Sequence, residues 1–329
     1  MTGATTRWGI LSTGGIANAF AEDLALVPRA ELAAVGSRRV RTAKAFAAKH
    51  GIPRAYGSWA ELAADPDVDV IYVATPHSAH LPATRLCLNA GKPVLCEKPL
   101  TLDRPSSAEL VALARERRVF LMEAMWTRTL PAFRRMRETI DAGVIGEVTA
   151  LHADFGIAGP FPPQHRVRAP GLGGGALLDL GVYCVTLAHA LLGMPQRIQA
   201  LATLTPEGVD ENTAIQLAYN SGAVATMHCG IVNDGPVSAT IVGTRGHIVV
   251  PRDFYRMDGF TVVSGGRSEQ VEAPRRGNGL GHEAEHVMAC LAAGRGESDL
   301  VPLDTTLEVM GILDEIRAQI GVVYSDKDV

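Results

Sequence analysis

The sequence predicts an α/β protein with an N-terminal Rossmann domain, built on a doubly wound parallel sheet, and a C-terminal α/β domain with an open, mostly antiparallel sheet. In the first third of the chain, short apolar runs alternate with helical stretches, as strands and helices do in parallel sheets. After about Trp126, strand-like segments follow one another through short turns, which indicates antiparallel pairing. Because 329 residues exceed one ordinary core, we expect a cofactor domain at 1–126 and a substrate-binding and oligomerisation domain at 127–329.

The elements of the first domain follow from apolar runs and helical periodicity. The clearest strand is Val68–Ala74, a nearly continuous run of β-branched and aliphatic residues. The other expected strands are Trp8–Ser12, Leu32–Gly36, Pro93–Cys96 and Phe120–Met125. The expected helices are Gly15–Leu26, Arg41–His50, Leu81–Ala90 and Ser106–Arg117.

The second domain begins with a helix and an alternating strand, the pattern of a sheet with one buried face. Its expected strands are Val148–Gly156, Ile198–Leu204, Thr213–Tyr219, Ala223–His228, Ser238–Val242 and His247–Val250. Its expected helices are Phe133–Ala142, Ala176–Leu192, His282–Ala293 and Asp304–Ile320.

Composition excludes several classes of function. The net charge is only −4 and no long basic run occurs, so neither nucleic acid nor an anionic membrane is an expected partner. We find no uninterrupted apolar stretch of about 18 residues, and the start of the chain lacks the apolar core of a secretory signal. The five cysteines are scattered without a C-x-x-C pair, which is typical of reduced thiols. We therefore expect a cytoplasmic protein.

A dinucleotide-binding turn is predicted between the first strand and the first helix. The segment Gly9–Ala17 fits G-x-G-x-x-G/A with Ser12 in place of the first glycine, then Gly14 and Ala17. Gly14 would allow close approach of a pyrophosphate, which the helix N-terminus would hold. An ordinary strand-turn-helix remains the alternative. The residues expected at the pyrophosphate are Ser12, Gly14, Gly15 and Ile16.

The end of the second strand indicates which dinucleotide binds. An NAD enzyme usually places Asp or Glu there, on the ribose 2′-OH. This chain instead has Ser37 and Arg38, with no acid. A guanidinium pairs with a 2′-phosphate that an acid would repel. These two residues therefore predict NADP, and the alternative is a solvated basic turn.

Three further motifs resemble one family. They are Ala74–His80 (ATPHSAH), Leu95–Pro99 (LCEKP) and Gly174–Tyr183 (GGALLDLGVY). In this order they resemble the glucose-fructose oxidoreductase/inositol dehydrogenase (Gfo/Idh/MocA) superfamily, over nearly the whole chain. The segment Leu121–Arg128 (LMEAMWTR) and the terminal Ile320–Val322 narrow the likeness to the branch of dimeric trans-1,2-dihydrodiol dehydrogenases and NADP-dependent D-xylose dehydrogenases.

The resemblance implies roles for individual residues. Lys98 and Tyr183 correspond to the family's catalytic pair, and Asp179 would orient the substrate or Lys98. The expected cofactor contacts are Thr75, His77, His80, Glu97 and Lys98, besides those already named. The expected substrate contacts are His77, Trp126, Arg128, Phe155, Asp179 and Tyr183. For His77 a helix cap is the alternative role, and for Trp126 and Phe155 it is packing between domains.

The function implied is NADP-dependent hydride transfer between nicotinamide and a sugar-like alcohol or carbonyl carbon, of the aldose 1-dehydrogenase or trans-dihydrodiol dehydrogenase type. Two alternatives remain: a 3-ketoreductase that acts on a nucleotide-linked deoxysugar, and a regulator that senses dinucleotide without catalysis. The partners expected are a small sugar or cyclic diol and a second copy of the chain, paired through the open C-terminal sheet. Retention of Lys98 and Tyr183 favours an enzyme.

One motif suggests a metal site that we do not expect. The segment His282–His286 matches H-E-x-x-H, the helix signature of zinc proteases. A five-residue pattern with two free positions arises readily by chance, and no third ligand is obvious nearby. We expect no metal in this protein.

Overall fold

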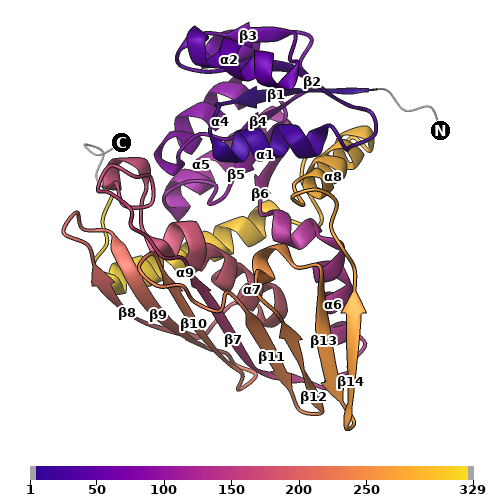
Figure 1. Ribbon diagram of the computed structural model, residues 1–329, viewed down its shortest axis with the longest axis vertical. Coiled ribbons are helices and arrows are strands. Elements are labelled where there is room, and N and C mark those ends of the chain that lie inside the picture. Colours follow the sequence, from indigo (N-terminus) through magenta and orange to yellow (C-terminus); the bar gives the residue numbers. More distant parts are fainter. Residues whose placement is uncertain (1–4, 325–329) are drawn as a thin grey trace. The chain divides into compact units, whose positions relative to one another are not determined.

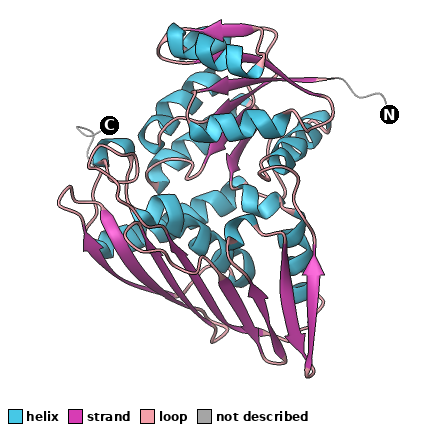
Figure 2. Ribbon diagram, in the orientation of Figure 1, coloured by secondary structure: helices cyan, strands magenta, loops and turns pink. Residues whose placement is uncertain are grey.

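The computed structural model describes residues 5–324 and confirms the predicted fold class, with one parallel and one mixed, mostly antiparallel sheet (Figures 1 and 2). The contacts divide the chain into two compact units. The first comprises Met1–Thr129 and Arg276–Leu307, and the second comprises Leu130–Arg275 and Glu308–Val329. The first unit thus includes Arg276–Leu307, a segment that lies in the second domain if the boundary is placed at residue 126 as we expected from the sequence.

The first unit contains a six-stranded sheet in the order β3-β2-β1-β4-β5-β6. All of its strand pairs are parallel, as in a doubly wound dinucleotide-binding fold. Its strands are β1 (Thr6–Leu11), β2 (Ala30–Gly36), β3 (Arg54–Tyr56), β4 (Val70–Val73), β5 (Val94–Glu97) and β6 (Leu121–Ala124). Its helices include α1 (Gly15–Leu24), α2 (Val40–His50), α3 (Trp59–Ala64), α4 (His80–Asn89) and α5 (Arg104–Arg117).

Helix α8 (Gly281–Ala292) belongs to this first unit because a buried carboxylate holds its start. Asp23 on α1 is 2% exposed and accepts hydrogen bonds from the backbone N–H groups of Asn278 and Leu280, both at 2.8 Å. A negative charge at a helix N-terminus is favourable because the backbone N–H groups there lack helical partners. This contact joins residues about 255 positions apart, so sequence periodicity could not predict it.

The second unit contains an eight-stranded sheet in the order β14-β13-β12-β11-β7-β10-β9-β8. Only β7 and β10 pair in parallel among its described strands. The strands are β7 (Val148–Gly156), β8 (Arg197–Leu204), β9 (Asp210–Ala218), β10 (Val224–Gly230), β11 (Ala239–Gly243), β12 (Gly246–Val250), β13 (Gly259–Ser264) and β14 (Arg267–Glu272). The last two were not among the expected strands.

Helices pack on one face of this sheet. Helix α7 (Val182–Leu192) contacts β7 and β10, and α6 (Pro131–Asp141) contacts β13, as Figure 1 shows. Along the middle of β7, buried and exposed side chains alternate, as expected for a strand with one buried face; Leu151 is buried and His152 is exposed. The last helix, α9 (Leu303–Ile320), begins in the first unit and continues in the second.

One helical stretch is apolar and long enough to cross a membrane. It runs from Pro170 to Leu192, and 89% of its most apolar window is buried inside the structure. Such burial is that of a core helix in a soluble protein, where an apolar surface on all sides meets other protein groups. The stretch therefore gives no support to a membrane span.

Candidate active site

The turn between β1 and α1 has the backbone of a phosphate-binding loop. Ser12 has φ of +116°, a conformation that favours glycine, and its N–H donates to Gly36 O at 2.9 Å. Within residues 5–324, no side chain caps α1, and a Cβ placed on Gly14 or Gly15 would meet no atom within 4 Å. Open space in front of uncapped N–H groups suits an anion.

The end of β2 presents positive charge and a hydroxyl. Ser37 is half-buried, and its Oγ lies 2.7 Å from Thr42 Oγ1. Arg38 is exposed, and no acid occurs from residue 37 to 41. A guanidinium and a hydroxyl are hydrogen-bond donors, so this end of β2 offers groups that could bind an anion.

The loop after β4 is fastened to the loop after β5 by His80. Its side chain is 0% exposed, with Nδ1 at 2.8 Å from Pro99 O and Nε2 at 2.9 Å from Thr75 O. Burial lowers the pKa of His80 to about 4. An enclosed ring can affect the cofactor only through the loops that it holds. His77 is half-buried and begins a short turn ahead of α4, with its ring edge-on to that of His80 at 5.6 Å.

Lys98 lies directly after β5, where parallel sheets bind ligands. Its side chain is 9% exposed. Glu97, 7% exposed, accepts hydrogen bonds from the Tyr72 hydroxyl and, at 3.2 Å, from Lys98 N. Lysine is almost never so deeply buried unless it is paired or functional.

Besides His77, two predicted substrate residues of the first unit, Trp126 and Arg128, lie after β6. Trp126 is 7% exposed, and its carbonyl accepts the Thr129 hydroxyl at 2.7 Å. Arg128 is half-buried and favours the ionised form of Glu123 on β6. Glu123 itself was not among the predicted site residues.

In the second unit, Asp179 and Tyr183 lie near the start of the helix that follows the glycine cluster. The sequence predicted one α-helix over Ala176–Leu192, but residues Leu177–Gly181 form a π-helical turn before α7. The wider turn changes the helical phase between Asp179 and Tyr183. Asp179 is 4% exposed and pairs with Arg166 at 2.9 Å. Widened turns of this kind are frequent at functional sites.

Tyr183 belongs to an aromatic cluster. Its ring centroid lies 5.6 Å from that of Phe155 and 5.3 Å from that of Tyr255. Phe155 and Tyr255 stack at 4.5 Å, and burial raises the pKa of the Tyr255 hydroxyl. The cluster unites the two predicted residues with Tyr255, which no motif in the sequence marked. Such a surface suits the apolar face of a sugar or an aromatic ring.

A buried carboxyl group holds the start of the same helix. Asp210 is 0% exposed, and its Oδ2 accepts from Leu177 N at 2.8 Å and from the Thr213 hydroxyl at 2.7 Å. Burial raises the pKa of Asp210. No motif indicated this contact, because Leu177 and Asp210 are 33 residues apart.

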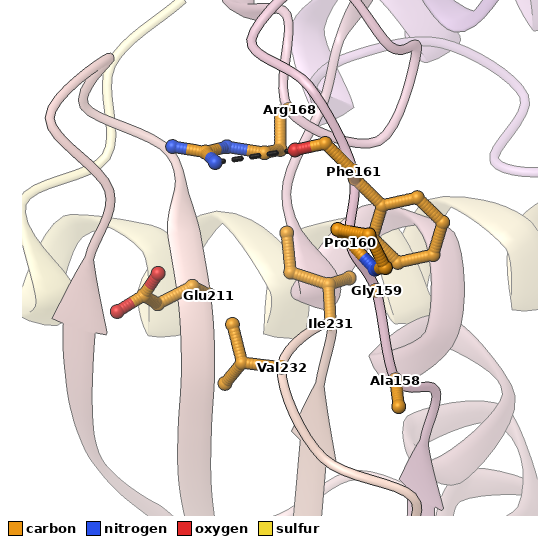
Figure 3. Close-up of a pocket in the computed structure, with 8 residues that line it drawn as sticks. All are labelled: Ala158, Gly159, Pro160, Phe161, Arg168, Glu211, Ile231 and Val232. Carbon is orange, nitrogen blue, oxygen red and sulfur yellow. Dashed lines mark hydrogen bonds between the residues drawn. The ribbon is translucent and has the colours of Figure 1, made fainter.

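A cavity of about 310 Å³ lies in the second unit beside the loop that follows β7. Its lining includes Phe161, Arg168, Glu211 and Ile231 (Figure 3). The Arg168 guanidinium donates to Phe161 O at 3.2 Å, the bond drawn in Figure 3, and to Glu207 at 2.7 Å. None of the predicted catalytic residues lines this cavity, so it is separate from the side chains described above.

The H-E-x-x-H segment does not form the arrangement of a zinc protease. His282 Nε2 accepts from Arg276 N at 3.1 Å, whereas His286 Nε2 lies 2.7 Å from Ser298 Oγ. Glu283 is 0% exposed, and burial raises its pKa well above the usual range. A fully enclosed carboxyl group has no access to a metal-bound water, so it cannot serve as its base.

We predict that metal removal leaves activity intact. His286, Cys290 and Asp299 have potential ligand atoms within 4.8 Å of one another, but Arg295 binds the Asp299 carboxylate at 2.8 Å. That guanidinium competes with a cation for the carboxylate. Treatment with EDTA should leave turnover unchanged, and metal analysis should find no stoichiometric zinc. One zinc per chain, with activity lost on its removal, would contradict the prediction.

A Rossmann unit with an open phosphate turn, joined to a mixed-sheet unit, defines the protein as an oxidoreductase that uses a nicotinamide dinucleotide. Residues 6–125 match the oxidoreductase family with an NAD-binding Rossmann fold, and residues 133–249 match the GFO/IDH/MocA C-terminal domain. The chain belongs to the GFO/IDH/MocA oxidoreductase family.

Named relatives and solved structures agree with this assignment. The chain is 40% identical to a trans-1,2-dihydrobenzene-1,2-diol dehydrogenase of Mus musculus, over 97% of this chain and 98% of that one. Its Xenopus tropicalis counterpart is 38% identical, over 97% and 99%. A 3-ketoreductase from Actinomadura kijaniata with NADP and TDP-benzene superposes with a TM-score of 0.85, at 29% identity over 96% and 98%. An aldose-aldose oxidoreductase from Caulobacter crescentus gives 0.87, at 26% identity over 96% and 97%.

Proposed function

We propose that the protein is an NADP-dependent dehydrogenase or reductase that acts on a CH–OH carbon of a sugar or cyclic diol. The observation that carries the proposal is Lys98, a nearly buried ammonium directly after β5 in a Rossmann unit. The named dehydrogenase relatives over nearly the full chain support the same reaction class. A positive charge held at this edge is suited to stabilise negative charge on a reacting oxygen.

The proposed mechanism assigns the proton to Tyr183 and the charge to Lys98. When bound in the loops named below, NADP would accept a hydride at nicotinamide C4, and NADPH would supply one. In the oxidation direction, the Tyr183 side chain acts as a phenolate whose oxygen takes the proton of the substrate hydroxyl, while Lys98 Nζ stabilises the developing alkoxide. In reduction, the Tyr183 hydroxyl returns that proton to the carbonyl oxygen. Asp179 would orient the substrate hydroxyls, with Arg166 fixing its carboxylate at 2.9 Å.

The proposed binding residues fall into two groups. The aromatic rings of Trp126 and Phe155 would pack on the substrate, with Arg128 and His77 as polar contacts. The cofactor would be held by backbone groups and side chains of the three loops that follow β1, β4 and β5. These are Ser12, Gly14, Gly15, Ile16, Thr75, His77, Glu97 and Lys98, and the enclosed His80 would contribute through the two loops that it joins.

We predict that Arg38→Ala selectively weakens the use of NADP. Loss of a charge-assisted contact worth about 1.5–3 kcal/mol should raise the KM for NADP about tenfold or more. The KM for NAD should barely change, because NAD lacks the 2′-phosphate. Steady-state kinetics with both cofactors tests this. Equal losses with NADP and NAD would show that Arg38 does not read the 2′-phosphate.

The proposed reaction is tested by a substrate screen with the purified chain. NADP is offered with D-xylose, other aldoses and trans-1,2-dihydrobenzene-1,2-diol, and NADPH fluorescence is followed. We expect sustained NADPH formation with at least one of these alcohols. A fluorescence change on NADPH binding, without turnover in either direction, would contradict the proposal and favour a dinucleotide-sensing regulator.

A second candidate is a 3-ketoreductase that acts on a nucleotide-linked sugar. The observation in its favour is the TM-score of 0.85 with the 3-ketoreductase bound to NADP and TDP-benzene. The higher identity to diol dehydrogenases, 38–40% against 29%, favours the first candidate. Oxidation of NADPH by a TDP-linked 3-keto sugar, with no activity on free aldoses or diols, would support the second candidate.

We also propose a cytoplasmic homo-oligomer. The five cysteines lie buried as free thiols, which suits a reducing compartment. The sheet face opposite α7 carries Leu201, 80% exposed, and Val249, 37% exposed. Exposed apolar side chains on a broad sheet favour pairing with another copy of the chain. Light scattering coupled to size exclusion would measure the assembly.

A further inference from the structure

We propose that Glu123 is a positioning residue that holds the segment from Lys98 to Leu100 against α9, and that its carboxylate form is the active one. The proposal rests on the proposed function of Lys98 at the reacting oxygen. None of the sequence motifs or relatives assigns Glu123 a role.

The contacts of Glu123 join two separate parts of the first unit. Oε1 accepts from Leu100 N at 3.0 Å, and Oε2 accepts from the Thr306 hydroxyl at 2.8 Å. Leu100 N is two residues beyond Lys98, and Thr306 lies on α9, 183 residues away from Glu123. Both oxygens therefore act as acceptors, which an ionised carboxylate does best.

The same segment is fixed from its other side. His80 Nδ1 lies 2.8 Å from Pro99 O, the residue between Lys98 and Leu100. Glu123 and His80 thus contact the same peptide group between Pro99 and Leu100, Glu123 through the Leu100 N–H and His80 through the Pro99 carbonyl. Two buried contacts on adjacent residues leave the backbone beside Lys98 little freedom.

The position of Glu123 also gives its charge a direct effect on Lys98. Glu123 is 4% exposed and pairs in register with Cys96, two residues before Lys98. The charged groups that face it are Lys98 and Arg128, and both favour its ionised form, as do Leu100 N and the Thr306 hydroxyl. Burial opposes these effects and raises the pKa of Glu123 to about 7.

Protonation of Glu123 near neutral pH should therefore weaken its hold on the segment from Lys98 to Leu100. Below about pH 7 the carboxyl gains a proton, so one oxygen becomes a donor group and accepts poorly. Lys98 and Arg128 then lose a facing negative charge. Activity should fall toward acid pH in both the oxidation and the reduction direction. A proton on Tyr183, by contrast, should oppose oxidation and favour reduction. Comparing the two directions therefore distinguishes the effect of Glu123 from that of Tyr183.

The test compares E123Q and T306V in the full chain, with E109Q as a matched control on the exposed face of α5. We expect E123Q to lower kcat about 10- to 100-fold, the scale of a small misplacement of a catalytic group, with little change in the KM for NADP. Its pH profile should lose the step near 7. T306V should keep that step but move it to higher pH, because the Thr306 hydroxyl lowers the pKa of Glu123. E109Q should match the wild type.

A second measurement does not depend on activity. In the chain labelled at glutamate carboxyl carbons, one NMR signal should titrate near pH 7, disappear in E123Q and shift in T306V. The inference would be overturned if E123Q kept the wild-type kcat and the pH step near 7. It would also be overturned if the step in T306V stayed at the wild-type pH. If no substrate turns over, the proposed function fails, and the NMR titration still decides whether Glu123 titrates as inferred.

Discussion

Replacing Tyr183 with phenylalanine is expected to lower turnover about 10²–10⁴-fold, the usual contribution of general acid–base transfer. The variant keeps the ring, which packs at 5.6 Å from Phe155 and 5.3 Å from Tyr255, and removes only the hydroxyl. NADP binding should stay intact, since the hydroxyl acts on the substrate. Stopped-flow or steady-state kinetics with a fluorescence titration of NADPH measures both quantities. Near-normal turnover would exclude Tyr183 as the proton carrier.

Lys98→Ala should cost at least as much, because it removes the charge that stabilises the alkoxide and assists the tyrosine. If Lys98 and Tyr183 act on the same oxygen, their effects are non-additive. The double variant should then be little slower than the slower single variant. Losses that multiply would mean that the two residues serve separate steps. The exposed Lys44→Ala on α2 is a control for loss of a positive charge.

Most strands of the fold were predictable because burial left an apolar pattern in the sequence, although β13 was missed despite its buried Phe260 and Val262. The run Val68–Ala74 contains β4, which is buried throughout, so both of its faces read as apolar. Strand β14, with the sequence RSEQVE, is almost entirely exposed and carries no such pattern. Strand β3 has only three half-buried residues. Both were missed because they are strands through their pairing with β2 and β13, while their own side chains show no strand pattern.

The candidate site was predictable only in part. Position along the chain selected Ser37 and Arg38, whose proposed role depends on their distance from the glycine turn. Lys98 and Tyr183 were selected by family resemblance, since a lone lysine or tyrosine carries no signal. Tyr255, which stacks on Phe155 at 4.5 Å, is a hundred residues away from it in the chain. Such contacts arise from strand order, which local periodicity does not encode.

The second large expected effect concerns Gly175, which lies just before the helical segment that carries Asp179 and Tyr183. Gly175→Ala should lower the free energy of unfolding by about 3–5 kcal/mol, through backbone strain and crowding together. Gly175 has φ of +121°, and a Cβ there would lie 2.3 Å from Asp210 Oδ1 and 3.2 Å from the Tyr324 hydroxyl oxygen. Thermal and urea unfolding would measure the loss.

A matched control separates the two causes. Gly208 also has a positive φ, +88°, but a Cβ there would meet no described atom within 4 Å. Gly208→Ala should therefore cost only the strain of a left-handed residue, about 1–2 kcal/mol. Equal losses at the two positions would refute crowding as a cause.

A Cβ at Gly175 should also disturb the proposed active site, because it would push against Asp210. Asp210 cannot yield freely, because its Oδ2 accepts from Leu177 N at 2.8 Å and from the Thr213 hydroxyl at 2.7 Å. Displacing it would release the first turn of the helix two residues before Asp179. Gly175→Ala should therefore lower kcat as well as stability, whereas Gly208→Ala should leave kcat unchanged. In an Asp210→Ala background the added cost of Gly175→Ala should shrink, because contacting residues couple. An undiminished cost in that background would show that the crowding does not act through Asp210.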